Sequence, residues 1–228
     1  MNSSVVCLDA ADTLFSERED RAALYAEAFA HFKMAIPVPL MAQWMKEVHE
    51  EMPSRLEEEP RYSRPWFREF VGRLIHRTGE SSDPESVRAH LEEIFTDPSR
   101  YVVFSDTFPA LDDLSQAGCR LAVVSNWSDR LEGLLNALGL LSYFEVLAVS
   151  AVVGIDKPAP GLFHHALNVL DVRPDHALHV GNDTCNDLEG ALSAGMKALL
   201  LDRTAQPSST PSHVITSLLD IPKRLTKS

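Results

Sequence analysis

The sequence predicts an α/β fold with a mainly parallel sheet, interrupted near its N-terminal end by a helical insert. From about residue 101 onward, short apolar runs alternate with segments whose apolar residues have helical spacing, a pattern typical of βαβ units. The expected strands of this part cover residues 120–125, 146–149, 177–180, 198–201 and, at one edge, 214–215. An isolated apolar run at residues 5–8 predicts one more strand of the same sheet.

Amphipathic helices are expected between these strands. They cover residues 110–117, 131–138, 162–170 and 187–194. Gly118, Gly139 and Gly195 follow three of them closely, and glycine commonly ends a helix because it adopts the left-handed backbone conformation. Strand and helix therefore alternate regularly over the C-terminal half of the chain.

Residues 16–100 show a different pattern, with four helical stripes of apolar residues and no expected strand. Proline- or glycine-containing breaks at residues 37–39, 59–60 and 79–84 separate the stripes. Because the strand at residues 5–8 must still pair in the sheet, the α/β domain is discontinuous. We expect it to comprise residues 1–15 and 101–228, with a helical module at 16–100.

Composition and charge limit the classes of function that this chain can have. The 228 residues include 21 Lys and Arg against 33 Asp and Glu, a net charge of −12, which argues against nucleic acid as a partner. No apolar stretch approaches the roughly 20 residues of a membrane helix, and no signal peptide is visible. The three cysteines have no paired spacing. A cytoplasmic location and a small-molecule substrate are therefore expected, with a monomer and a homodimer both left open.

Four segments carry chemistry, each near the end of an expected strand or the start of an expected helix. They are residues 9–14 (DAADTL), 123–126 (VVSN), 156–158 (DKP) and 179–187 (HVGNDTCND). Ligands of open parallel sheets bind beyond the carboxyl ends of the strands, so these segments are expected to meet there. An acid, a hydroxyl, a lysine and an acidic loop together indicate phosphoryl transfer to a carboxylate.

In this order the four segments resemble the motifs of the haloacid dehalogenase superfamily, in the group whose helical cap lies between the first and second motifs. The resemblance covers essentially the whole chain. It implies a Rossmann-like three-layer α/β/α core with a mainly parallel sheet and an inserted four-helix cap. It also implies a hydrolase, most often a Mg²⁺-dependent phosphatase for a small phosphorylated molecule.

The resemblance gives each motif residue a role. Asp9 is the expected nucleophile, and an aspartate is ionised at neutral pH because its ordinary pKa is about 3.9. Ser125 is expected to hold the phosphoryl oxygens, helped by the positive end of a helix beginning near Trp127. Lys157 would neutralise charge on Asp9 and on the transferring group. The substrate-binding set is expected to be completed by Thr13 and Asn126.

The metal ligands implied by the resemblance are Asp9, the backbone carbonyl of Ala11 and Asn182, supported by Asp187. Relatives usually have Asp where this chain has Asn182. An amide oxygen coordinates Mg²⁺ but adds no charge, so weaker metal binding is expected. Asp183 lies between the two positions and is an alternative source of the missing charge.

Ala11 is the main departure from the family pattern. Most phosphatases of the family have Asp there as the general acid and base, and Asp12 stands where they usually have Gly. Loss of such a group typically costs about 10²–10⁴ in rate. Asp12 is therefore a candidate replacement for the catalytic acid and base.

Alternative activities stay open beside a phosphatase that acts on substrates with good leaving groups. A 2-haloacid dehalogenase needs no acid at the Ala11 position, because halide leaves unprotonated. Phosphonoacetaldehyde-type hydrolases have Ala there and use a cap lysine, for which Lys33 and Lys46 are the candidates. The last alternative is a catalytically silent relative that binds a phosphorylated ligand or a protein.

Overall fold

The computed structural model describes residues 5–56, 58–206 and 211–225. The chain divides into two compact units, one built from Met1–Ser16 and Val103–Ser228 and the other from Glu17–Val102. The sequence patterns placed these two divisions after residues 15 and 100.

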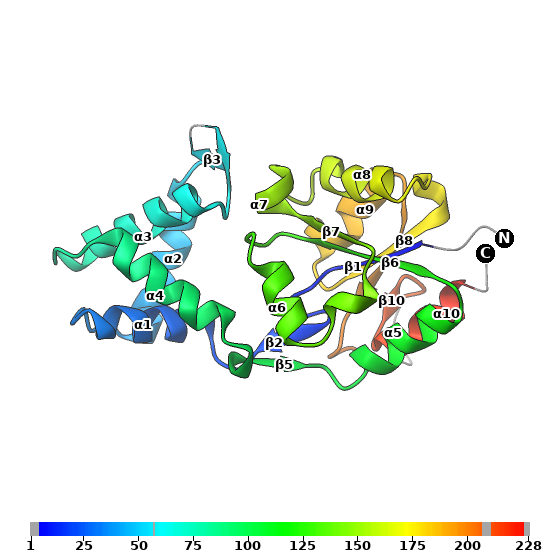
Figure 1. The fold of residues 1–228 in the computed structure, drawn as a ribbon, viewed down its shortest axis with the longest axis horizontal. Helices are drawn as coiled ribbons and strands as arrows, with labels where there is room; N and C mark the ends of the chain where they lie inside the picture. The colour runs from blue at the N-terminus through cyan, green and yellow to red at the C-terminus, as the bar shows by residue number, and fades with distance from the viewer. Residues whose placement is uncertain (1–4, 57, 207–210, 226–228) are drawn as a thin grey trace. The chain divides into compact units, whose positions relative to one another are not determined.

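The first unit contains a six-stranded sheet in the order β10-β9-β8-β1-β6-β7 (Figure 1). Its strands are β1 (Val5–Leu8), β6 (Arg120–Ser125), β7 (Val146–Val149), β8 (Ala177–Gly181), β9 (Lys197–Leu201) and β10 (Val214–Ile215). Each neighbouring pair runs parallel, with Val5 opposite both Arg120 and Ala177. The predicted α/β class and the edge strand at 214–215 are confirmed.

Helices cover both faces of this sheet. They are α5 (Thr107–Gln116), α6 (Leu131–Ala137), α7 (Ser150–Val153), α8 (Pro160–Val169), α9 (Gly190–Ser193) and α10 (Ile221–Leu225). Figure 1 shows α8 and α9 on one face and α5 and α10 on the other. Under α8, Leu162 and Phe163 join a buried apolar cluster with Val124 of the sheet. The unit is therefore the expected three-layer core.

Strand β1 is the central strand of the sheet. Its four residues, Val5, Val6, Cys7 and Leu8, are all fully buried. Such a continuous apolar run is typical of a parallel strand covered on both faces. This placement puts Asp9, the next residue, at the middle of the carboxyl edge of the sheet.

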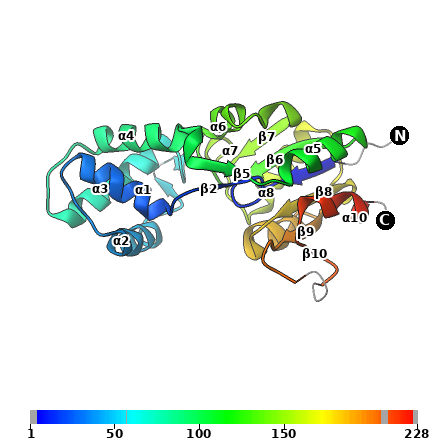
Figure 2. The same ribbon diagram turned by 90° about the horizontal axis from the view of Figure 1, so that it is seen from below.

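The second unit contains four helices (Figures 1 and 2): α1 (Arg21–His31), α2 (Val38–Glu51), α3 (Arg64–Thr78) and α4 (Pro84–Thr96). They form at the four predicted stripes, and the side chains of Asp20, Ser63 and Asp83 cap the first turns of α1, α3 and α4. The stripes share one buried core that includes Phe29, Met41, Leu74 and Leu91. Of the helices the structure describes, none is long and apolar enough to cross a membrane.

Short strands also occur where none was expected. β2 (Phe15–Glu17) pairs with β5 (Tyr101–Val103), and β3 (Arg55–Leu56) pairs antiparallel with β4 (Glu59–Pro60). The expectation that residues 16–100 lack strands is therefore wrong. Strands of two or three residues are too short to show an alternating pattern, and Pro60 reads from sequence as a simple break.

Candidate active site

Three motif residues lie at the carboxyl ends of neighbouring strands. Asp9 follows β1, and its backbone N–H donates to the carbonyl of Val180 in β8 at 2.9 Å, which extends the strand pairing by one residue. Ser125 is the last residue of β6, and Gly181 is the last residue of β8. Because the strands are parallel and in register, these residues come together at one edge of the sheet.

Lys157 connects this edge to the loop that follows β8. Its Nζ donates to Asp9 Oδ1 at 2.7 Å and to Asp187 Oδ1 at 2.5 Å. The lysine side chain is only 3% exposed. Burial alone would lower the pKa of Lys157, but the charges of Asp9 and Asp187 outweigh it and raise that pKa. Lys157 is therefore a buried cation shared by two carboxylates.

Asp187 is held by three donors. Besides Lys157 Nζ, His179 Nε2 lies 3.0 Å from Oδ1, and the backbone N–H of Asp183 donates to Oδ2 at 3.0 Å. Burial would raise the pKa of Asp187, but the hydrogen bond from His179 and the charge of Lys157 hold it below its usual range. With Oδ1 accepting two hydrogen bonds, Oδ2 is the oxygen with capacity for another partner.

His179 is fully buried in β8. Its Nδ1 has no hydrogen-bond partner among the described residues, so the ring proton is assigned to Nε2, which faces Asp187. Phe163 packs edge-on against the ring at 5.0 Å between centroids. His179 thus fixes the orientation of the Asp187 carboxylate.

The two carboxylates that share Lys157 differ in their pKa. Burial raises the pKa of Asp9, and the attraction of Lys157 offsets this only in part because the negative charge of Asp187 opposes it. Among the described residues, Lys157 is the only side chain that donates a hydrogen bond to Asp9. The charge of Asp9 is therefore only partly compensated by its surroundings, whereas Asp187 is held by three donors.

The loop after Asp9 is fastened by contacts that the sequence did not signal. Thr13 is fully buried, and its hydroxyl donates to Asn182 Oδ1 at 3.3 Å. Its carbonyl accepts from Arg203 at 2.8 Å, and Arg203 also pairs with Asp106 at 3.0 Å. Asp106 and Arg203 are 97 residues apart, so no local pattern could have found them.

Ser125 ends β6 and Asn126 directly follows it, but their side chains differ in their hydrogen bonding. Ser125 is 2% exposed, and its hydroxyl makes no hydrogen bond to the part of the chain that the structure describes. The Asn126 side chain instead binds the backbone of Lys157, accepting from its N–H at 2.7 Å and donating to its carbonyl at 2.9 Å. The hydroxyl of Ser125 is thus available to a ligand.

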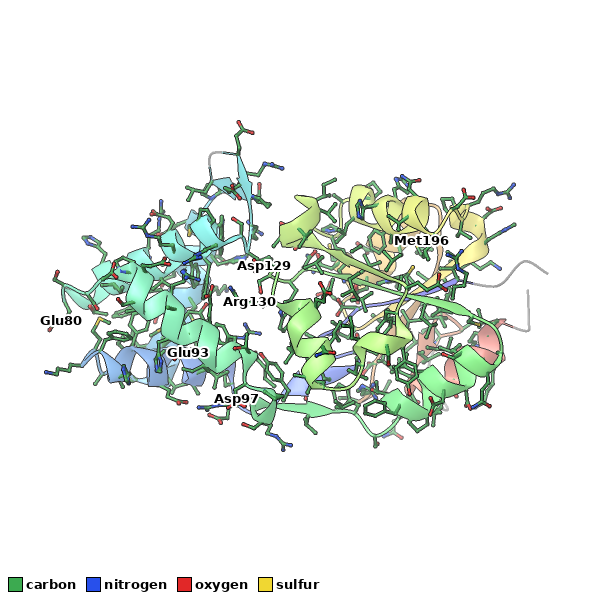
Figure 3. The ribbon with its side chains drawn as sticks, in the orientation of Figure 1. Glu80, Glu93, Asp97, Asp129, Arg130 and Met196 are labelled. Carbon is green, nitrogen blue, oxygen red and sulfur yellow. The ribbon has the colours of Figure 1, made fainter. Side chains whose placement is uncertain are left out.

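The helix expected near Trp127 begins later, at Leu131, and has seven residues. Asp129 and Arg130, labelled in Figure 3, form a turn before it. The carbonyl of Trp127 accepts hydrogen bonds from Ser150 and Ala151, which ties this residue to α7. The expectation of a helix start at Trp127 is therefore wrong.

The helix expected from Asp187 begins earlier. A π-helical turn covers Thr184–Glu189 and continues into α9. Asp183 caps this turn, because its side chain accepts from the backbone N–H of Asn186 at 2.6 Å. Asp187 consequently lies within the turn, and its carboxylate points back to the backbone of Asp183.

Asp12 has an unusual backbone conformation. Its φ is 56°, in the left-handed region that costs a non-glycine residue about 1–2 kcal/mol. A hydrogen bond from its N–H to the carbonyl of Phe15, at 2.7 Å, holds the turn. The side chain is exposed, and its carboxylate accepts no hydrogen bond from the described residues. Strained residues of this kind concentrate at functional sites.

The oxygen donors at this edge are of the chemical kind that Mg²⁺ prefers. Mg²⁺ commonly takes one or two carboxylates together with waters and substrate phosphate. Asp9 and Asp187 supply two carboxylates on either side of one ammonium group, and Asn182 supplies a neutral oxygen. Clusters of three or more His, Cys, Asp or Glu residues suited to a metal are absent from the described residues. These candidate metal ligands therefore carry little negative charge, and all of them are hard oxygen donors.

Fold and site together define a hydrolase of the haloacid dehalogenase type. The family model for haloacid dehalogenase-like hydrolases matches residues 4–195, and the chain belongs to this family.

Similar proteins include a domain-containing protein of the family, a named phosphatase and a solved hydrolase structure. Haloacid dehalogenase-like hydrolase domain-containing protein 3 from Bos taurus is 28% identical over 226 residues, covering 92% of this chain and 88% of its own length. Phosphoserine phosphatase from Thermus thermophilus is 33% identical over 158 residues, covering 64% and 63%. The magnesium-bound structure of the HAD-hydrolase YfnB from Bacillus subtilis has a TM-score of 0.76 at 18% identity, covering 99% of this chain and 100% of its own.

Gly181→Ala is predicted to disrupt the site by displacing Asp187. A Cβ atom at position 181 would lie 2.2 Å from Asp187 Cγ, far inside van der Waals contact. We expect the free energy of unfolding, measured by urea denaturation, to fall by about 1–3 kcal/mol. The matched control is Gly133→Ala in α6, where a Cβ meets no atom within 4 Å. Equal stability of the two variants would contradict this prediction.

Asp9→Asn is predicted to stabilise the metal-free protein. A carboxyl whose pKa is raised on folding adds stability below its unfolded pKa of about 3.9, and this contribution is lost as the pH rises through the folded pKa. Once Asp9 is ionised, its buried charge therefore lowers the free energy of unfolding. We expect the Tm of the variant in EDTA at pH 7, measured by differential scanning calorimetry, to be higher than that of the native protein. A lower Tm would contradict the prediction.

Proposed function

We propose that this chain is a magnesium-dependent phosphatase that dephosphorylates a small metabolite through an aspartyl-phosphate on Asp9. The observation that carries the proposal is the 2.7 Å contact between Lys157 Nζ and a buried, incompletely compensated carboxylate at the end of the central strand. Family membership and the similarity to a phosphoserine phosphatase support phosphatase chemistry.

In the first step, a carboxylate oxygen of Asp9 attacks phosphorus. The new P–O bond forms as the ester P–O bond breaks, and the electron pair of that bond leaves with the substrate oxygen. The hydroxyl of Ser125 and the ammonium group of Lys157 bind the phosphoryl oxygens and stabilise their charge. The proposal thereby uses a serine hydroxyl that has no protein partner among the described residues.

In the second step, water attacks the phosphorus of the aspartyl-phosphate. Inorganic phosphate is released, and the carboxylate of Asp9 is restored. Protonation of the leaving group and deprotonation of water require an acid and base that Ala11 does not provide. We assign this role to Asp12, whose exposed carboxylate and strained backbone support the assignment.

Magnesium would be held by Asp9, the backbone carbonyl of Ala11 and Asn182, with Asp187 in support. When bound, the cation neutralises negative charge on the carboxylate and on the phosphoryl oxygens. This compensation is needed because the chain has a net charge of −12 and its substrate is also an anion. Asp183 adds a further negative charge beside Asn182.

Hydrolysis of p-nitrophenyl phosphate with Mg²⁺ tests the proposal. We expect Asp9→Asn to lower kcat/KM by roughly 10³-fold or more, because removal of a covalent nucleophile abolishes the reaction path. EDTA should have a comparable effect on the native protein. The matched control is Asp113→Asn, which changes an exposed carboxylate of α5 and should leave the rate unchanged.

Two outcomes would contradict the phosphatase proposal. If native protein and Asp9→Asn are equally inert over a broad panel of phosphate esters, the chain is a binding relative without this activity. If the native protein releases chloride from 2-chloropropionate without metal and leaves phosphate esters intact, it is a dehalogenase.

Asp12→Asn tests the acid and base role. Asparagine tolerates the left-handed conformation of Asp12, so the turn is expected to keep its shape while the carboxyl group is lost. We expect kcat for alkyl phosphates to fall by roughly 10²–10⁴-fold, with a smaller decrease for aryl phosphates, whose leaving groups need little protonation. Equal rates of native and variant protein on an alkyl phosphate would remove Asp12 from the mechanism.

A further inference from the structure

Lys157 lies outside regular secondary structure, yet its side chain must be placed accurately. It lies between α7, which ends at Val153, and α8, which begins at Pro160. From this loop its side chain must bring Nζ between Asp9 and Asp187. A lysine side chain has four rotatable carbon–carbon bonds, so the position of Nζ depends on where the backbone is held.

The backbone of Lys157 is held by the side chain of Asn126. Asn126 Oδ1 accepts from the Lys157 N–H at 2.7 Å, and Asn126 Nδ2 donates to the Lys157 carbonyl at 2.9 Å. One carboxamide thus satisfies both backbone polar groups of a residue 31 positions away in the sequence. The reciprocal pair resembles the hydrogen bonding between neighbouring strands, with a side chain in place of one backbone.

Asn126 is well suited to act as this anchor because it directly follows Ser125, the end of β6. β6 is paired on both sides, with β1 and with β7. A loop that is hydrogen-bonded at this point is therefore held in a fixed position relative to the sheet. It also fixes the position of Lys157 relative to Ser125, the other residue proposed to bind the phosphoryl group.

We infer that Asn126 is a positioning residue that holds the backbone of Lys157, so that Nζ lies between Asp9 and Asp187. The inference rests on the proposed function for its catalytic consequence, but the placement of Lys157 can be tested separately. It differs from the sequence-based expectation that Asn126 binds substrate, because the amide oxygen and one amide hydrogen are already bonded to Lys157.

A double-mutant cycle tests whether Asn126 acts through Lys157. The variants are Asn126→Ala, Lys157→Ala and the combination of both, assayed on p-nitrophenyl phosphate with Mg²⁺. We expect Asn126→Ala to lower kcat/KM by roughly 10–10²-fold, mainly through kcat, because small misplacements of a reacting group have effects of this size. In the Lys157→Ala background the same change should cost nothing further. Asn136→Ala, at an exposed asparagine of α6, is the matched control and should behave as native protein.

A loss that is equal in both backgrounds would overturn the inference and favour direct contact of Asn126 with substrate. A native rate for Asn126→Ala would overturn it as well. Asn126→Ser, which cannot bridge both backbone groups, replaces the alanine variant if that variant does not fold.

The crystal structure of the Asn126 variant gives an answer that does not depend on catalysis. We expect Lys157 Nζ to lose its contact with Asp9 Oδ1 or with Asp187 Oδ1. If both contacts persist, the inference is wrong whatever the kinetics show. If the native protein is inert but Nζ moves in the variant, the phosphatase proposal fails and the positioning role stands.

Discussion

One buried ammonium group, Nζ of Lys157, sets the electrostatics of this molecule. It bonds to Asp9 at the end of the central strand and to Asp187 in the loop after β8. The hydrogen bond from His179 completes the compensation of Asp187, whereas burial leaves the pKa of Asp9 raised. An asymmetry between two carboxylates that share one cation therefore separates the proposed nucleophile from a supporting acid.

The strands and loops around Lys157 Nζ explain how this buried cation is held next to its two carboxylates. Three neighbouring parallel strands place Asp9, Ser125 and Gly181 at one edge, and Gly181 leaves room for Asp187 against its Cα. Side chains then fix the loops that the sheet does not reach. Asn126 holds the backbone of Lys157, and Arg203 holds the carbonyl of Thr13. The strand ends thus determine where the site lies, and side-chain hydrogen bonds fix the positions of its loops.

The sequence predicted the parts of this arrangement that depend on repeated local patterns. Five apolar runs and the edge strand at 214–215 became the six parallel strands, and four stripes became α1–α4. The strands β3 and β4 were missed because two residues carry no periodicity. The apolar spacing at residues 131–138 matched α6, whereas the helix start expected near Trp127 was wrong because Trp127 bonds to α7, a contact that the local sequence does not reveal. Pairs such as Asn126 with Lys157 lie far apart in the chain and leave no local signal.

Covalent bonding of Asp9 to the transferred group is the central claim, and a crystal structure with beryllium fluoride and Mg²⁺ tests it most directly. Beryllium trifluoride mimics a phosphoryl group on a carboxylate. The account predicts a beryllium–oxygen bond to Asp9, with fluorine atoms facing the hydroxyl of Ser125 and Nζ of Lys157. Beryllium bound to another residue, or an Asp9 side chain turned away from Lys157 and the cation, would contradict it.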